Sequence, residues 1–186
     1  MKKLILIGGT LATGKSTYSL ILKEKYNLTV INKDRLKEIL GDNIYVKTRE
    51  ENKKLSVICF DLMMYLLDCN ETCIVLESNF KDYEMKALKE KCEKLNYSVL
   101  SLFFDAKNEV LHQRFNERLN NNRHYVHKSQ DFTNLSDFVE VLDDLRKTEY
   151  FGKIINVDCT NFNYQQDEKL FKEIEKFIGK KDYENK

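Results

Sequence analysis

A short run of residues near the N-terminus has the types and the spacing that binding of a phosphate chain requires. Residues 9–16 match the pattern G-x-x-x-x-G-K-[ST] at every fixed position. In such a loop the glycines let backbone N–H groups curl around a phosphate, the lysine reaches the β- and γ-phosphate oxygens, and the serine hydroxyl ligates Mg²⁺. The pattern predicts a site for ATP and Mg²⁺ made by Gly9, Thr10, Leu11, Ala12, Thr13, Gly14, Lys15, Ser16 and Thr17.

The segments on either side of this loop are those that a phosphate site needs. The apolar run at 4–7 has the length and composition of a strand, and residues 15–26 have the pattern of a helix. A helix N-terminus carries a partial positive charge and unpaired N–H groups, and both favour an anion. The pattern G-x-G-x-x-G is absent here, which excludes the dinucleotide-binding loop that has the same surroundings.

Polar residues also follow the second predicted strand, at 29–31. The sequence Asn32-Lys33-Asp34-Arg35 would lie at the carboxyl edge of the sheet, where open α/β sheets bind their ligands. A carboxylate there can orient an alcohol and receive its proton during phosphoryl transfer, so Asp34 is the candidate general base. We expect Asp34 and Arg35 to contact the phosphate acceptor. Asp34 is alternatively an N-cap of the next helix, and one residue can serve both roles.

An acidic residue ends the third predicted strand, at 73–76. Glu77 follows a run of hydrophobic residues, as the acid of a Walker-B element does, and should face the bound phosphates. It can hold Mg²⁺ through water or contact the acceptor, and the sequence does not separate these roles. A third interpretation makes it a structural partner of an arginine. Asn79 is a further candidate for hydrogen bonding to the acceptor.

Three arginines follow the fourth predicted strand. Arg114, Arg118 and Arg123 fall within a segment at about 112–130 that we interpret as a small lid over the phosphates. Guanidinium groups suit this role because they stay charged and can grip phosphate oxygens in the transition state. Charged residues spaced four apart also mark a solvated helix face, which is the alternative interpretation of the first two.

The remaining pattern is a regular alternation of strands and helices. It predicts an α/β protein with the three-layer α/β/α fold of P-loop NTPases, a five-stranded, mostly parallel sheet and a small helical lid, in one domain spanning 1–186. One helix is expected to cross the sheet with a broad apolar face formed by residues 55, 58, 59, 62, 63, 66 and 67. Strands are expected at 4–7, 29–31, 73–76, 99–104 and 154–157, and helices at 15–26, 34–40, 50–69, 82–95, 107–120, 136–147 and 167–178.

Composition restricts the setting and the partners. The net charge of +1 gives no general attraction to nucleic acid or membranes. The five cysteines are odd in number and form no C-x-x-C pair, which favours a reduced, cytoplasmic environment. The apolar run near the N-terminus is too short for a signal peptide, and no stretch approaches the roughly 18 residues of a membrane span.

The chain resembles the small P-loop kinases, a group often described as AAA-type ATPase domain proteins. Its relatives of this kind include polynucleotide 5′-kinases, chloramphenicol phosphotransferases and zeta-toxin kinases. The resemblance rests on residues 1–17, on Asn32-Lys33-Asp34, on Glu77-Ser78-Asn79 and on the arginine-bearing lid. It implies that Asp34 is the base and that Glu77 touches the acceptor. The arginine that follows the base in polynucleotide kinases is replaced here by Lys37, which argues against a nucleic-acid substrate.

Three functions are compatible with these residues. The leading hypothesis is a kinase that uses ATP and Mg²⁺ to phosphorylate a hydroxyl of an unidentified small molecule or nucleotide, as a monomer or dimer. Lys15, Asp34 and the lid arginines would be its catalytic residues. A polynucleotide or RNA 5′-OH kinase is the first alternative. A nucleotide-binding regulatory ATPase without a phosphate acceptor is the second.

Overall fold

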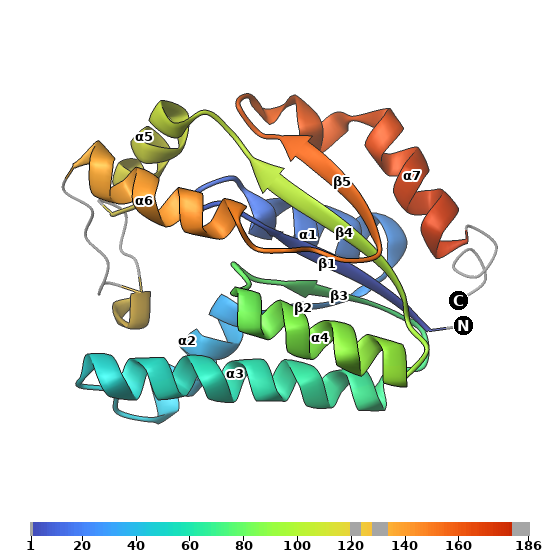
Figure 1. Cartoon of the computed structure of the whole chain (residues 1–186), viewed down its shortest axis with the longest axis horizontal. Coiled ribbons are helices and arrows are strands. Elements are labelled where there is room, and N and C mark those ends of the chain that lie inside the picture. The colour runs from blue at the N-terminus through green and yellow to red at the C-terminus, as the bar shows by residue number, and fades with distance from the viewer. Residues whose placement is uncertain (1, 120–123, 128–133, 180–186) are drawn as a thin grey trace.

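The protein is built around a five-stranded sheet in which every pair of neighbouring strands is parallel (Figure 1). We describe it from a computed structural model that covers residues 2–119, 124–127 and 134–179. The strand order is β2-β3-β1-β4-β5. The strands are β1 (Lys3–Gly9), β2 (Thr29–Asn32), β3 (Cys73–Glu77), β4 (Ser98–Asp105) and β5 (Lys153–Asp158).

Helices cover both faces of this sheet and complete a three-layer α/β/α fold (Figure 1). Helices α1 and α7 pack on one face, whereas α3 and α4 pack on the other. A third apolar cluster joins α5 and α6 next to the loop after β1. The helices are α1 (Lys15–Tyr26), α2 (Lys33–Asn43), α3 (Arg49–Cys69), α4 (Asp82–Lys94), α5 (Asn108–Leu119), α6 (Leu135–Arg146) and α7 (Glu168–Ile178), with short 3₁₀ helices η1 (Tyr125–His127) and η2 (Phe162–Gln166).

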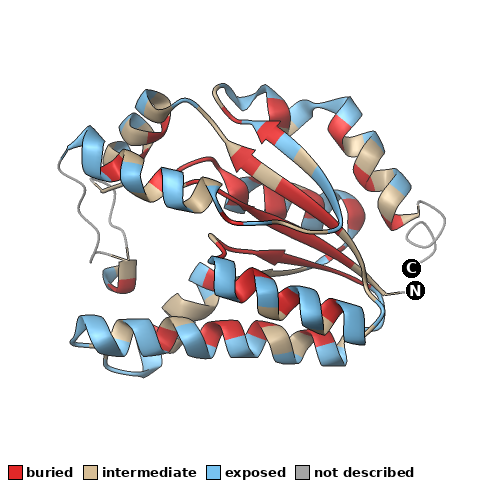
Figure 2. Ribbon diagram, viewed as in Figure 1, coloured by how far each residue is buried: buried red, intermediate tan, exposed pale blue. Residues whose placement is uncertain are grey.

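Strand β1 is the centre of the core because its side chains alternate between the two apolar layers. Leu4 and Leu6 belong to the cluster with α3 and α4, and Ile5 and Ile7 belong to the cluster with α1 and α7. All four are fully buried, as the red interior strands of Figure 2 show. Burial of each such side chain stabilises the folded protein by about 1.5–3 kcal/mol. Strand β1 is therefore firmly held in the core and fixes the start of the loop that follows it.

The expected strands and helices all occur within the described residues, with ends that shift by a few positions. The broad apolar face expected on α3 is wrong in part. Cys59, Met63 and Leu67 are buried as expected, but the side chains of Ile58 and Leu62 are exposed. No helix among the described residues has the length and apolarity to cross a lipid bilayer.

The register of β2 and β3 determines which polar residues meet at the carboxyl edge. Asn32, the last residue of β2, pairs with Glu77, the last residue of β3. Parallel strands end at the same edge of a sheet, so the segments that follow these residues leave it side by side. The loop after β1 reaches the same edge because Ile7 also pairs with Glu77.

Candidate active site

The loop between β1 and α1 has the backbone that its glycines predict. Gly9 and Gly14 have φ of 124° and 87°, in the region that only glycine adopts without strain. A Cβ on Gly9 would lie 2.0 Å from the Phe104 carbonyl oxygen, so the loop also passes too close to β4 for a side chain. Helix α1 begins at Lys15, directly after the loop, and a helix N-terminus in this position favours the binding of an anion.

Lys15 is folded across this loop. Its Nζ donates to the Thr10 carbonyl oxygen and, at 3.0 Å, to Thr13 Oγ1. The residue is 7% exposed, and burial lowers the pKa of its ammonium group to about 8, although the charge of Glu77 opposes the shift. An ammonium group in such surroundings gains strongly from an anionic ligand that would compensate its charge.

Glu77 is the centre of a buried hydrogen-bond network. Its carboxylate accepts from Ser16 Oγ at 3.1 Å and from Asn32 Nδ2. Burial raises the pKa of Glu77, and the charge of Asp34 raises it further, while Lys15 and the hydrogen bonds lower it. The structure therefore brings the serine hydroxyl and the acid together, as the sequence predicted for a pair that holds Mg²⁺. Oxygen atoms of this kind are the ligands that Mg²⁺ prefers.

A cavity of about 830 Å³ joins the loop to the groups that follow β2 and β3. Most of the residues expected to bind ATP or the acceptor line it, whereas Gly9 and Thr10 are not among the described residues that do so. The expected residues that line it are Leu11, Ala12, Thr13, Gly14, Lys15, Ser16, Thr17, Asp34, Arg35, Glu77, Asn79 and Arg118.

The three arginines of the expected lid have different surroundings. Arg118 lines the cavity. Arg114 is not among the described residues that line it; its guanidinium donates to the carbonyl oxygens of Cys159 at 2.6 Å and Thr160 at 3.2 Å. The same group lies 4.2 Å from the centroid of the Phe162 ring. Arg123 and parts of the expected lid at 112–130 lie outside the described residues.

The N-cap of α2 is Asn32, and the interpretation of Asp34 as the cap is wrong. Asn32 Oδ1 accepts from the Arg35 N–H at 2.7 Å. Because the helix begins at Lys33, Asp34 falls in its first turn, with its side chain exposed to the cavity. The Asp34 carboxylate therefore does not cap the N-terminus of α2.

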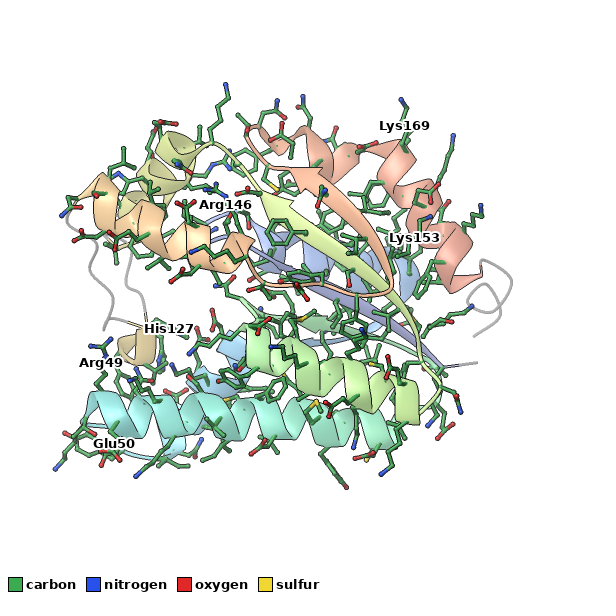
Figure 3. The ribbon with its side chains drawn as sticks, in the orientation of Figure 1. Arg49, Glu50, His127, Arg146, Lys153 and Lys169 are labelled. Atoms are coloured by element: carbon green, nitrogen blue, oxygen red, sulfur yellow. The ribbon has the colours of Figure 1, made fainter. Side chains whose placement is uncertain are left out.

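The short helix η1 falls within the segment expected as a lid and contributes His127, labelled in Figure 3, to the lining of the cavity. His127 Nε2 lies 3.3 Å from Glu38 Oε1, and both residues line the cavity. Val126 is buried against Gly41 of α2, where a Cβ would lie 2.6 Å from the valine. Asn52 of α3 donates to the Val126 carbonyl oxygen at 3.0 Å. His127 was not among the expected site residues, and its place in the H-x-x-H sequence at 124–127 is the one local signal that could have indicated it.

Two supports of the phosphate loop come from distant parts of the chain. Tyr164 Oη, from η2, donates to the Thr13 carbonyl oxygen at 2.9 Å. Thr10 Oγ1 donates to Asp105 Oδ1 at 2.9 Å, and that carboxylate is also bound by Arg146, labelled in Figure 3. Both contacts fix the loop from outside the ligand cavity.

We expect Gly14→Ala to destabilise the protein by about 2–4 kcal/mol, because the substitution adds strain at positive φ and overlap in a packed site. A Cβ at this position would lie 2.3 Å from Tyr164 Oη but 3.6 Å from the nearest ring carbon. The double variant Gly14→Ala/Tyr164→Phe should therefore regain part of the loss. Urea denaturation of the single and double variants measures both effects. Equal stability of Gly14→Ala and Gly14→Ala/Tyr164→Phe would show that the overlap is not the cause.

Comparisons with known proteins agree with this geometry. The sequence model of the AAA domain family matches residues 5–133. No curated protein matches the sequence. Similar solved structures include a candidate kinase from Chloroflexus aurantiacus, with 20% identity, a TM-score of 0.79 and coverage of 95% of this chain and 98% of that chain. Shikimate kinase from Aquifex aeolicus has 14% identity, a TM-score of 0.60 and coverage of 93% and 96%.

Kti12 from Chaetomium thermophilum, solved in complex with ADP-AlF3, has 14% identity, a TM-score of 0.62 and coverage of 95% and 99%. These structures share the fold of the small P-loop kinases, which the strand order and the phosphate loop of this protein independently indicate. Because the family match covers well over half of the sequence, the chain belongs to the AAA domain family.

Proposed function

We propose that this protein is a kinase that transfers the γ-phosphoryl group of ATP to a hydroxyl group of a small molecule, in the presence of Mg²⁺. One observation carries the proposal: the Asp34 carboxylate lines the same cavity as Lys15 and Ser16. A cavity that only binds a nucleotide does not require a second carboxylate besides the one that could hold Mg²⁺. A kinase does, because the acceptor hydroxyl must be oriented and must lose its proton.

The residues of the loop hold the phosphates in this proposal. Backbone N–H groups between Gly9 and Ser16 surround the β-phosphate, and the Lys15 ammonium turns from the loop carbonyl to the β- and γ-phosphate oxygens. Ser16 and Glu77 would hold Mg²⁺, directly or through water, and the bound ion would supply positive charge to neutralise the phosphate oxygens. Arg118, from the cavity wall, is the lid residue that faces the transferring group.

The loop after β5 is the proposed site of the purine ring. Arg114 does not face the phosphates but holds this loop through the carbonyl oxygens of Cys159 and Thr160. The planar guanidinium and the Phe162 ring next to it offer flat surfaces suited to a base. In this proposal Arg114 supports binding of the nucleotide. Of these two arginines, both expected from the sequence to be catalytic, only Arg118 contacts the transferring phosphoryl group.

Transfer of labelled phosphate from γ-labelled ATP to a panel of metabolites and oligonucleotides tests this proposal. We expect a phosphorylated small molecule, identified by mass spectrometry, and ADP release that depends on the acceptor. Labelled oligonucleotide alone would instead identify the 5′-OH kinase. Steady ATP hydrolysis with no labelled product across the panel would favour the regulatory ATPase and contradict the proposal.

A further inference from the structure

The side chain of Asn79 contains a polar atom that the folded protein leaves unsatisfied. Its Oδ1 atom is buried and has no hydrogen-bond partner among residues 2–119, 124–127 and 134–179. Buried amide oxygens in native proteins almost always accept a hydrogen bond, because an unpaired one is costly. Asn79 also lines the cavity that holds Lys15 and Asp34, so a bound molecule can supply the missing donor.

The cavity brings this oxygen together with the proposed base. Asn32 and Glu77 end neighbouring strands and are partners in the β2–β3 ladder. Asp34, in the first turn of α2, and Asn79, in the segment after β3, both line the cavity at this edge of the sheet. A single small molecule bound in the cavity can therefore contact both residues.

Several basic groups near Asp34 are engaged by carboxylates of the protein. Arg35 lies 3.0 Å from Glu38, and His127 contacts the other oxygen of the same carboxylate. Lys33 forms an ion pair with Glu84 in which both side chains are nearly buried. The charge of Lys37 acts on Asp34 itself. Asp34 and Asn79 Oδ1 both offer hydrogen-bond acceptors, which suits a ligand with more than one neutral donor.

We infer that the acceptor is a polyol that binds by two hydroxyl groups, one to Asp34 and one to Asn79 Oδ1. The inference rests on the proposed kinase function and adds the class of its substrate. The hydroxyl at Asp34 reacts: its oxygen forms a bond to the γ-phosphorus, and the bond from that phosphorus to the β,γ-bridging oxygen breaks. The electron pair of the broken bond leaves with ADP, and the hydroxyl proton passes to the Asp34 carboxylate. The hydroxyl at Asn79 does not react and fixes the orientation of the molecule.

Matched pairs of acceptors test the class of substrate. Each pair contains a polyol and an analogue with one hydroxyl, such as glycerol with 1-propanol, and myo-inositol with cyclohexanol, together with pentoses, hexoses and their deoxy forms. Transfer is measured from γ-labelled ATP. Sites that bind a substrate hydroxyl reject analogues without it by large factors, so we expect kcat/KM at least about 10³-fold higher for the preferred polyol. Equal rates for a polyol and its single-hydroxyl analogue, or preference for an amine, would overturn the inference.

Variants of Asn79 test the role of the unsatisfied oxygen without knowledge of the acceptor. Asn79→Leu keeps the branched skeleton in a larger side chain that can extend into the cavity, and it removes the buried oxygen, so we expect its Tm to rise by about 2–6 °C. Asn79→Asp keeps an oxygen at the position and should retain polyol phosphorylation that Asn79→Leu loses. The affinity for ATP and its dependence on Mg²⁺, both measured by calorimetric titration, should stay unchanged in both variants. A lower Tm for Asn79→Leu would indicate a structural role, and a changed Mg²⁺ requirement would assign the oxygen to the metal; either result overturns the inference.

The two proposals fail in distinguishable ways. If alcohols with one hydroxyl are phosphorylated as fast as polyols, the kinase function stands and only the polyol inference is overturned. Binding of ATP without transfer to any member of the panel removes the kinase function, and the polyol inference falls with it.

Discussion

Replacement of Lys15 by Met is expected to weaken nucleotide binding strongly and, at the same time, to make the free protein more stable. The loss of binding follows from removal of the cation proposed to contact the phosphates, a change that costs about 2–5 kcal/mol in comparable charge pairs, or about 30- to 4,000-fold in affinity. The gain in stability follows from the burial of the ammonium group, whose pKa falls to about 8 in the folded protein.

The direction of this gain depends on pH. In the unfolded chain the pKa of a lysine is about 10.4, so between pH 8 and pH 10.4 the unfolded state binds more protons than the folded state. The stability of the wild-type protein relative to Lys15→Met therefore rises with pH across this window. Below pH 8 the full penalty of the buried charge applies, and the shift from 10.5 to about 8 corresponds to about 3 kcal/mol.

Thermal unfolding at pH 7 and at pH 10.5 measures this effect. At pH 7 we expect the Tm of Lys15→Met to exceed that of the wild type by about 2–10 °C, with the hydrogen bonds to Thr10 and Thr13 offsetting part of the gain. At pH 10.5 the difference should be small. Lys89→Met, at an exposed position of α4, is the matched control and should not change the Tm by more than about 2 °C. A Tm of Lys15→Met below that of the wild type at pH 7 would contradict the prediction.

The parts of the fold that depend on local pattern could be predicted from the sequence. The continuous apolar runs of β1 and β3 are typical of strands buried on both faces of a parallel sheet. The glycines of the phosphate loop indicate backbone angles that other residues rarely adopt. Their spacing also fixes Lys15 and Ser16 at the start of α1. A motif of this kind needs only a few consecutive residues, so no tertiary information is required to recognise it.

The contacts that complete the site depend on tertiary placement and leave no local signal. Tyr164 and Thr13 are 151 positions apart, and Arg146 and Asp105 are 41 apart, so neither pair has a spacing that a sequence pattern can reveal. The meeting of Asn32 with Glu77 at the edge of the cavity follows from the pairing of β2 with β3. Alternation of strands and helices does not determine which strands are neighbours, so this pairing could not be read from the sequence.

The error on α3 has a related physical cause. A helical stripe shows which residues can be buried, but the width of the buried part depends on what packs against the helix. Cys59 and Met63 face the interior, whereas Ile58 and Leu62, on the same apolar stripe, remain exposed. Asp34 illustrates the same limit at a single position: its type suited an N-cap, but Asn32 occupies that position because α2 begins earlier than expected.

Replacement of Asp34 by Asn is expected to slow phosphoryl transfer by about 10²- to 10⁴-fold while binding of ATP changes little. The amide has the shape of the carboxylate and can still accept a hydrogen bond from the acceptor hydroxyl, but it cannot receive the proton. Because Asp34 is exposed in the first turn of α2 and does not cap the helix, the cost to stability should be below about 1 kcal/mol. A loss of kcat therefore cannot be attributed to unfolding.

Asp82→Asn is the control, because Asp82 is also exposed in the first turn of a helix, α4, and is not among the described residues that line the cavity; its partner is Lys86, at 2.8 Å. This variant removes the same charge from the first turn of a helix outside the cavity and should keep the wild-type kcat. Calorimetric titration with ATP and Mg²⁺, together with single-turnover transfer, separates binding from chemistry. Wild-type transfer rates in Asp34→Asn would exclude Asp34 as the base. A raised KM for ATP with unchanged kcat would place its carboxylate at the nucleotide instead of the acceptor.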